Sequence, residues 1–379
     1  MSNENVARLF NVRSHNPSFF SVRESAGYQG ELLDFCIPVN LHFPPAAFID
    51  LVHNSLNNIL RYYPDYAEVH QKHIAEMTGL PSETIVPANG STEIITSLCQ
   101  HLRGPIVTSI PTFSRWTDLP TELGVPLYTV NRKRENQFRL STNEVARTVR
   151  DTAARTLILS NPNNPTGACF ELEEIVELAD ELSELDAIII DESFIDFSDL
   201  KSSAQLVTDR PNLIVVKSMG KSIGWHGVRL GYAVTNPSRA RLLRDALPFW
   251  NINGLAAFVL QTLPNFKREY RASFALVKED CAYMKTALSK LRALTIYPTQ
   301  ANFIYAELPA EISGRTLRDR LLVDYGIMVR ECSNKLGSSE QYLRLAVQKK
   351  SAVDELVNAL ERELNHGWRS ETTTASTFR

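Results

Sequence analysis

The sequence lacks the features that mark membrane, disulfide-rich or nucleic-acid-binding proteins. Its longest apolar runs, such as residues 187–190 and 213–216, are far too short to span a bilayer. Its five cysteines are scattered without a C-x-x-C pair, which favours reduced thiols over disulfides or metal ligands. A formal net charge of −3 gives no global attraction to nucleic acid or anionic lipid. We therefore expect neither nucleic-acid nor membrane partners, and no metal site.

Targeting signals and common nucleotide motifs are also missing from the sequence. Residues 1–5 do not show the basic-then-apolar order of a signal peptide, so we expect a cytoplasmic protein. No G-x-G-x-x-G follows an expected strand, which argues against a nicotinamide dehydrogenase. Gly220-Lys221-Ser222 resembles the end of a P-loop, but Val215 stands where that motif requires glycine.

The 379 residues have the composition of an ordinary globular protein, with 44% hydrophobic and 22% charged residues. Short apolar runs alternate with helical patterns, which predicts an α/β fold with a mostly parallel sheet. The expected strands are residues 85–86, 106–110, 127–130, 156–159, 187–190 and 213–217, with clear helices at 46–59 and 172–185. After residue 248 the pattern changes to longer helices, a strand pair at 294–297 and 302–307, and a last helix near 352–364.

These patterns predict two domains of unequal size. Residues 46–247 form a large domain whose mostly parallel sheet is flanked by helices, and residues 248–366 form a smaller α+β domain. Residues 1–45 form an irregular N-terminal arm that joins the small domain, and the polar residues 367–379 form a disordered tail.

Lys221 stands in the setting of an amine that binds pyridoxal phosphate as a Schiff base. It follows the expected strand 213–217, with Ser218 three residues before it and Arg229 eight residues after it. A lysine amine forms an imine with an aldehyde cofactor, which then acts as an electron sink. The hydroxyl of Ser218 and the guanidinium of Arg229 would hold the cofactor's phosphate. We predict Lys221 as the catalytic residue.

Polar residues follow other expected strands, and in such a sheet ligands bind at the carboxyl ends of the strands. Asp191 ends a buried run, where a carboxylate needs a cationic partner such as the cofactor's pyridinium nitrogen. Gly90, Ser91 and Thr92 open a helix, whose free N–H groups favour a phosphate. The same residue types also serve as ordinary helix caps.

Two further residues complete the predicted cofactor site. Asn164, within the N-P-N-N-P-T-G segment at residues 161–167, can offer its amide to the cofactor's phenolic oxygen. Phe113 follows the strand 106–110 and can stack on the pyridine ring, although a lone aromatic residue is more often part of a core.

With these residues in view, the chain resembles a fold-type I pyridoxal-phosphate enzyme of the aminotransferase class I/II family over nearly its full length. It is similar to the branch that holds histidinol-phosphate aminotransferase and threonine-phosphate decarboxylase. The segments that carry the resemblance are residues 61–65 (R-Y-Y-P-D), 191–197 (D-E-S-F-I-D-F), 227–232 (G-V-R-L-G-Y) and 342–346 (Y-L-R-L-A).

The resemblance implies roles for residues that periodicity and spacing do not single out. Tyr63 would reach the cofactor phosphate of a neighbouring subunit, so that the active unit is a homodimer. Arg344 would bind the substrate's α-carboxylate, and Arg330 would contact a distal phosphate of the substrate. Asn40 and His42 would line the substrate pocket.

Some positions are closer to the decarboxylase than to the aminotransferase. Phe194 stands where typical aminotransferases of the family have a tyrosine, and the decarboxylase is similar in having phenylalanine. The interval from Arg330 to Arg344 and residues 22–26 also look like the decarboxylase. Residues 15–17 lack both glycines of the decarboxylase's His-Gly-Gly element, residues 40–43 replace an Asn-Pro-x-Gly segment, and His226 replaces a small residue or proline.

The sequence therefore predicts an enzyme that acts on the α-amino group of a small amino acid substrate. Our main prediction is an aminotransferase that works through a Lys221 Schiff base and a quinonoid intermediate. The alternative is a decarboxylase of a phosphorylated or acidic amino acid, because the bond that breaks at Cα depends on its orientation to the cofactor ring. Another Cα or Cβ reaction and a regulatory protein without catalysis are further alternatives. Intact Lys221, Asp191 and Arg229 argue against the regulatory protein.

Overall fold

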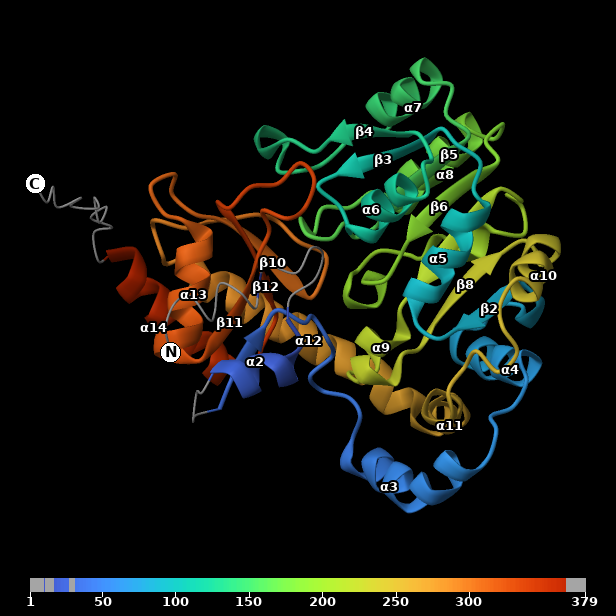
Figure 1. Cartoon of the computed structure of the whole chain (residues 1–379), viewed down its shortest axis with the longest axis horizontal. Coiled ribbons are helices and arrows are strands. Elements are labelled where there is room, and N and C mark those ends of the chain that lie inside the picture. The colour runs from blue at the N-terminus through green and yellow to red at the C-terminus, as the bar shows by residue number, and fades with distance from the viewer. Residues whose placement is uncertain (1–9, 11–16, 27–30, 366–379) are drawn as a thin grey trace, which may run out of the picture.

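The fold consists of two lobes, each built around its own β-sheet (Figure 1). The computed structural model describes residue 10, residues 17–26 and residues 31–365. The predicted tail and most of the predicted arm before residue 17 lie outside the described residues. The long helix α12 (Lys267–Leu288) extends from beside the larger lobe into the smaller one (Figure 1).

The larger lobe holds a seven-stranded, mostly parallel sheet. Its spatial order is β2 (Ile85–Ala88), β8 (Gly231–Thr235), β7 (Leu213–Lys217), β6 (Ala187–Asp191), β5 (Thr156–Ser160), β3 (Ile106–Ile110) and β4 (Leu127–Asn131). The strand β8 runs antiparallel to both of its neighbours, β2 and β7. Every residue of β3, β5, β6 and β7 is buried, as expected for parallel strands covered on both faces. These strands end at one edge, so the residues that follow them come close together.

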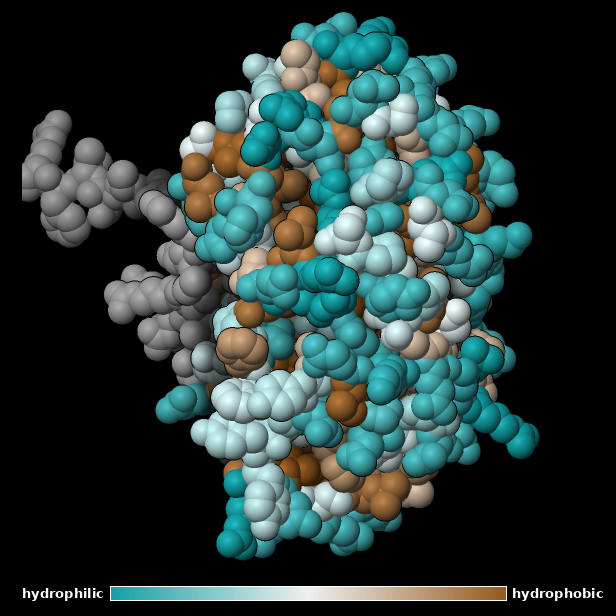
Figure 2. Space-filling view, turned by 90° about the vertical axis from the view of Figure 1, so that its right-hand side faces the viewer, coloured by the Kyte–Doolittle hydropathy of each residue, from teal (hydrophilic) through white to brown (hydrophobic). Residues whose placement is uncertain are grey.

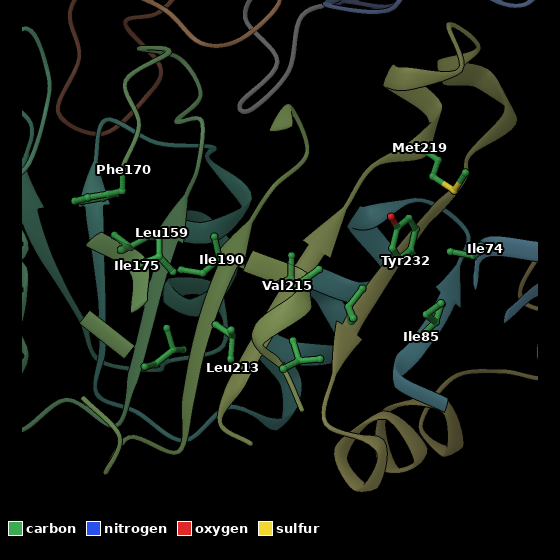
Figure 3. Packing of buried hydrophobic residues seen from close by; sticks show 14 of the residues in the cluster. Ile74, Ile85, Leu159, Phe170, Ile175, Ile190, Leu213, Val215, Met219 and Tyr232 are labelled. Atoms are coloured by element: carbon green, nitrogen blue, oxygen red, sulfur yellow. The ribbon is translucent and has the colours of Figure 1, made fainter. Parts of the chain in front are cut away.

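Helices cover both faces of this sheet because its strand residues alternate between two hydrophobic cores. Ile188 and Ile190 lie in the core that includes residues of α3, α4, α7, α8 and α11, whereas Ile189 lies in the core that includes α5, α6 and α10. Figure 3 shows Leu159, Ile190 and Val215 of three adjacent strands on the same face of the sheet. Burying one such side chain fully contributes about 1.5–3 kcal/mol.

The helices of this lobe begin at local sequence signals. A capping box of Glu171 and Glu174 starts α8, and Asn236 and Asn253 accept backbone N–H groups at the starts of α10 and α11. The helices are α3 (Ala46–Arg61), α4 (Ala67–Thr78), α5 (Ser91–His101), α6 (Arg115–Glu122), α7 (Thr142–Asp151), α8 (Leu172–Glu181), α9 (Met219–Ser222), α10 (Pro237–Asp245) and α11 (Gly254–Thr262).

The smaller lobe holds a five-stranded sheet with helices packed against it. Its order is β1 (Leu33–Phe35), β11 (Ile327–Glu331), β12 (Tyr342–Ala346), β10 (Phe303–Glu307) and β9 (Thr295–Ile296). The pairing of β1 with β11 is parallel and the other pairings are antiparallel. Residues of α12, α13 (Gly314–Tyr325) and α14 (Lys350–Asn365) share its core. The helix α2 (Phe19–Ala26) packs on this lobe through Val22.

The predicted fold class is confirmed, and the structure adds elements that the sequence patterns did not show. The predicted strands of the large sheet are present within one or two residues, whereas β8, β11, β12 and α2 were not predicted. The predicted domain boundaries stay predictions. Residues beyond the predicted boundary at 248, including Ile252, Ala256 and Leu260, share a core with the large sheet.

Hydrophobic residues are dispersed over the face that lies on the right of Figure 1. Figure 2 shows this face as mainly hydrophilic, with separate small hydrophobic groups, several of them toward the bottom. None of the helices in the described part of the chain combines the length and apolar character that crossing a bilayer requires.

Candidate active site

A cavity of about 380 Å³ lies where the carboxyl ends of the large sheet face the smaller lobe. Strand ends and loops of both lobes contribute to its wall. The predicted site residues that line it are Ser91, Thr92, Phe113, Asn164, Asp191, Phe194, Lys221, Arg229, Arg330 and Arg344. The cavity therefore brings together most of the side chains that the sequence analysis selected from segments far apart in the chain.

Lys221 lies in the short helix α9, directly after β7. Its Nζ donates a hydrogen bond of 3.0 Å to Ser218 Oγ and lies 5.0 Å from the centre of the Phe194 ring. The pKa of Lys221 is lowered to about 8, mainly by burial; Asp191 opposes this shift, and the charges of Arg344 and Arg229 contribute to it. A neutral amine, the form that attacks an aldehyde, is therefore more abundant near neutral pH than for a solvated lysine. Ser218 contacts the lysine but does not itself line the cavity.

Asp191 is held at the end of β6 by two donors. Its Oδ2 accepts a hydrogen bond of 2.8 Å from Trp116 Nε1, and its Oδ1 accepts one of 3.0 Å from the backbone N–H of Ser193. Trp116 is fully buried in α6. Trp116 was not predicted as a site residue. The one feature that could have pointed to it is that a buried indole N–H requires a hydrogen-bond acceptor. The two bonds fix a nearly buried carboxylate at the cavity wall.

Arg229 lies against the start of α5 in a strained backbone conformation. Its φ of 59° is in the left-handed region, which non-glycine residues rarely adopt. Gly90 has a φ of 84°, and a Cβ added there would come within 2.5 Å of Arg229 Nη2. Glycine at position 90 thus leaves room for the guanidinium at the start of α5. Arg229, Ser91 and Thr92 all line the cavity. This group of one cation and a helix start suits a phosphate.

Asn164 and Arg344 join the two lobes across the cavity. Arg344 Nη1 donates a hydrogen bond of 2.9 Å to Asn164 Oδ1, and Arg344 Nη2 donates to the backbone oxygen of Cys36. Burial lowers the pKa of Arg344 to about 10. The 161–167 loop is itself fixed, because Asn163 Nδ2 donates to Thr166 Oγ1 over 2.8 Å. Arg344 is therefore a positioned cation that the smaller lobe contributes to the cavity wall.

Two phenylalanines form apolar parts of the wall. Phe113 follows β3 and is partly exposed to the cavity. Phe194 is buried, with its ring at 87° to that of Phe303 in β10 and 4.9 Å between ring centres. Phe194 therefore belongs to the smaller lobe's core as well as to the cavity wall.

The smaller lobe supplies a second group of charged residues. Arg330 in β11 is buried and donates a hydrogen bond of 2.8 Å to Asn334 Oδ1. Lys335, in the loop after β11, is 5% exposed and was not singled out from the sequence. Asp34 of β1 also lines the cavity, and burial raises the pKa of its carboxyl group. Neither Lys335 nor Asp34 lies in a recognisable motif, so only the tertiary structure shows that they line the cavity.

Asn40 and His42 lie outside the cavity, although they were predicted to line the substrate pocket. Asn40 Nδ2 donates to Ser222 O over 2.9 Å and to Ser273 Oγ over 2.7 Å. The ring of His42 pairs with Asp280 of α12 at 2.7 Å. A Cβ on Gly224 would lie 2.4 Å from Asn40 O, so this segment passes very close behind α9. The physical reason for the displacement is that these side chains fasten the 40–43 segment to α9 and α12.

Tyr63 is also outside the cavity, on the surface just after α3. Its side chain is 82% exposed, and its ring lies 4.9 Å from that of Trp250. Its predicted role concerns a neighbouring subunit, so it stays a prediction.

The sequence matches the family described as aminotransferase class I and II over residues 31–360. The chain belongs to this family. Pyridoxal phosphate is therefore its cofactor, as the sequence predicts.

Several relatives carry the names of decarboxylases. L-serine phosphate decarboxylase from Sulfurospirillum multivorans is 31% identical over 93% of this chain and 93% of the relative. Threonine-phosphate decarboxylase from Salmonella typhimurium is 30% identical over 91% of this chain and 95% of the relative. Histidinol-phosphate aminotransferase from Desulfitobacterium hafniense is 27% identical over 90% and 95%. The predicted branch of the family is thereby confirmed.

Other relatives are longer proteins. CMP-5'-(3-aminopropyl)phosphonate synthase from Streptomyces rubellomurinus is 32% identical over 90% of this chain, and the chain spans about half (54%) of its length. Among solved structures, a decarboxylase from Sulfurospirillum multivorans has a TM-score of 0.88 at 29% identity, covering 96% of both chains. The predicted fold-type I architecture is confirmed by this likeness.

The cavity residues fit pyridoxal phosphate. Gly90, whose missing Cβ makes room for Arg229, and the start of α5 form a cradle suited to the phosphate. The fixed Asp191 carboxylate is suited to a protonated ring nitrogen, and the buried Lys221 amine is suited to form an imine with the aldehyde.

Proposed function

We propose that the protein is a pyridoxal-phosphate-dependent decarboxylase of a phosphorylated amino acid, with O-phospho-L-serine as the first candidate substrate. The observation that carries this proposal is the similarity to L-serine phosphate decarboxylase over 93% of both chains. Our sequence-based preference for transamination is thus replaced by the alternative, which these relatives support better.

The cofactor would be held mainly by the larger lobe. Arg229, with the start of α5 at Ser91 and Thr92, would bind its phosphate, and Ser218 would contribute through Lys221. Asp191 would face the ring nitrogen and Phe113 would stack on the ring. The Nδ2 group of Asn164 would donate to the phenolic oxygen, because its Oδ1 already accepts from Arg344. When bound, pyridoxal phosphate supplies the electron sink for the pair left on Cα.

Arg344 would receive the substrate's α-carboxylate at the part of the cavity wall that the smaller lobe contributes. Its guanidinium is held by Asn164 and Cys36, so little rotamer freedom is lost on binding. In the reaction the bond between Cα and the carboxyl carbon breaks and carbon dioxide leaves. A proton takes its place at Cα, and we assign its delivery to Lys221 Nζ, whose pKa of about 8 suits proton exchange near neutral pH.

The charge balance of the cavity supports a substrate with an extra anionic group. Among the residues that the structure describes, five cationic side chains line it, namely Lys221, Arg229, Arg330, Lys335 and Arg344, against the two carboxylates of Asp34 and Asp191. The cofactor phosphate and one α-carboxylate would satisfy Arg229 and Arg344. The remaining cations of the smaller lobe favour a phosphate on the substrate side chain.

Transamination remains the second candidate because histidinol-phosphate aminotransferase is also a relative. The observation that favours it is Arg344, since an arginine that holds the carboxylate fixed can direct cleavage to the Cα–H bond.

Product analysis by mass spectrometry separates the two reactions. The holoenzyme is mixed with O-phospho-L-serine, O-phospho-L-threonine, L-serine and L-aspartate, each with and without 2-oxoglutarate. Decarboxylation gives an amine lighter than its substrate by the mass of carbon dioxide, with no need for 2-oxoglutarate. A keto acid that forms only when 2-oxoglutarate is present would contradict the proposal and establish an aminotransferase.

We also propose that the active unit is a homodimer in which Tyr63 completes the partner's cofactor site. Support comes from the large apolar side chains exposed around Tyr63, which include Leu60, Phe249 and Trp250. Such a patch on a soluble protein commonly marks an interface.

Subunit mixing tests this arrangement. Lys221→Ala and Tyr63→Phe each impair their own preparation. In a mixed dimer one site combines an intact Lys221 with an intact Tyr63, so activity should rise on mixing. Activity equal to the average of the two preparations, under conditions in which subunits exchange, would exclude a shared site.

A further inference from the structure

Lys335 is a buried cation whose own contacts give it a more specific role than its share of the cavity's positive charge. Its side chain is 5% exposed and lines the cavity together with Arg330 and Arg344. No carboxylate of the described residues lies within 4 Å of its Nζ, so Lys335 has no ion pair among the parts of the chain that the structure describes. A buried ammonium group without such a partner is costly and rare.

The loop that carries Lys335 is fastened to the larger lobe. Lys335 Nζ donates a hydrogen bond of 3.2 Å to the backbone oxygen of Thr112, and it lies 5.8 Å from the centre of the Phe113 ring. Within the loop, Lys335 N donates to Cys332 O and Ser338 N donates to Lys335 O, both over 3.0 Å. These contacts hold the amine on the wall that is shared with Phe113, instead of leaving it free to reach solvent.

The charges around Lys335 are predominantly positive. The pKa of Lys335 is lowered to about 7, mainly by burial and in part by the neighbouring guanidinium groups of Arg330 and Arg344. Cys332 of the same loop and Asp118 of α6 oppose this shift, and they are the other titratable groups that act on it. Binding of an anion beside these cations would relieve their repulsion.

We propose that Lys335 is a specificity-determining residue that, together with Arg330, holds the anionic side-chain group of the substrate. A phosphate monoester suits this pair best, because its two charges and three oxygens can accept from a guanidinium fork and an ammonium group together. This assignment rests on the proposed function and extends it, since it names the residue that distinguishes phosphorylated from unphosphorylated amino acids.

The assignment carries a pH dependence. The anion binds the charged form of Lys335. At a pH where this amine is neutral in the free enzyme, the amine must take up a proton when the anion binds. The affinity for the anion therefore falls as pH rises above about 7. The pKa of Arg344 is lowered only to about 10, so this group stays charged in this range, and a phosphate monoester is already mostly a dianion there.

The experiment uses the holoenzyme, in which the cofactor already occupies its own phosphate site. Calorimetry measures the affinity for inorganic phosphate, and steady-state kinetics measures KM and kcat for O-phospho-L-serine. Both are measured from about pH 6 to about pH 9, on either side of neutral pH. The variants are Lys335→Met, Lys335→Arg, Arg330→Met and the double variant, with Lys201→Met at an exposed site as a matched control. Cofactor absorbance and thermal unfolding verify that each variant is folded.

The expected result is a Lys335→Met enzyme with phosphate affinity and KM weakened by about 10- to 100-fold, with a smaller change in kcat. The phosphate affinity of this variant should no longer fall as pH rises above neutral. Lys335→Arg should recover part of the affinity. The effects of Lys335→Met and Arg330→Met should be less than additive, because both residues hold one group. Lys335→Gln replaces the methionine variant if that protein does not fold.

Two outcomes separate this inference from the proposed function. If the wild-type enzyme decarboxylates O-phospho-L-serine and Lys335→Met changes neither KM nor phosphate affinity more than the control does, the role of Lys335 is wrong and the function stands. If phosphate affinity depends on Lys335 and Arg330 but no phosphorylated amino acid is decarboxylated, the anion site stands and the reaction is wrong.

Discussion

The two sides of the cavity are built in different ways. On the side of the large sheet, Asp191 and Lys221 directly follow adjacent strands, and each is fixed by neighbours such as Trp116 and Ser218. On the side of the smaller lobe, Arg330 and Lys335 come from a strand and a long loop, and among the residues that the structure describes no carboxylate forms an ion pair with Lys335.

This contrast indicates a division of labour between a permanent ligand and a transient one. A cofactor that stays bound balances the charges of the first side throughout the catalytic cycle, so that side can be tightly hydrogen-bonded. A substrate enters and leaves, so the second side must tolerate an excess of positive charge while it is empty. Unbalanced buried charge costs stability, and the variants below measure that cost and the role of each side.

The largest expected effect is on the cofactor side. Lys221→Ala removes the amine to which we assign aldehyde binding and proton delivery, so activity should fall by at least about a thousandfold. Borohydride reduction followed by mass spectrometry should find no cofactor attached to the variant, whereas the wild-type protein should carry it on Lys221. If the variant kept more than about a tenth of the wild-type rate, Lys221 would not be essential for the reaction.

The next effect tests whether Trp116 acts through Asp191. Trp116→Phe keeps most of the buried ring but removes the N–H that donates to Asp191 Oδ2. We expect kcat to fall by about 10-fold, the range of a lost hydrogen bond to a charged group, with a shift in the absorbance of the bound cofactor. In the Asp191→Asn background the same substitution should have a much smaller effect. An equal effect in both backgrounds would mean that Trp116 only supports the fold.

On the substrate side, removing a charge should raise stability. The pKa of Lys335 is lowered to about 7 in the folded protein, so between about pH 7 and 10 the unfolded chain binds more protons at this residue. The resulting penalty on folding grows as pH falls from 10 to 7 and is fully present below 7. Lys335→Met should therefore stabilise the cofactor-free protein by about 1–2 kcal/mol at pH 7 and have little effect above pH ~10.5. Denaturant unfolding at both pH values measures this, and destabilisation at pH 7 would contradict it.

The smallest effect concerns a residue that the sequence placed in the pocket and the structure does not. His42→Gln breaks the contact with Asp280 but touches no cavity residue. The free energy of unfolding should fall by about 1 kcal/mol, while KM for the substrate stays within about twofold. A large rise in KM without loss of stability would restore His42 to the substrate pocket.

The cofactor side could be predicted from sequence because its residues stand in short segments at strand ends. Buried apolar runs mark the strands, and the residues that follow them, such as Asp191 and Lys221, must converge at one edge of a parallel sheet. Phe194 was found through family resemblance, and its contact with Phe303 became evident only in the structure. The antiparallel strand β8 was missed because its residues were read only as a cofactor motif.

The sequence by itself determined the fold class and the cofactor and predicts Lys221 as the lysine that binds it, because these depend on local periodicity and on contiguous motifs. Only the tertiary structure decided which cations share the substrate side. Lys335 meets Thr112 and Arg344 meets Asn164 across more than a hundred residues of chain, and these contacts depend on how the two lobes close on each other. The structure also moved Asn40 and His42 out of the pocket, since side-chain partners on distant helices decide where a loop residue points.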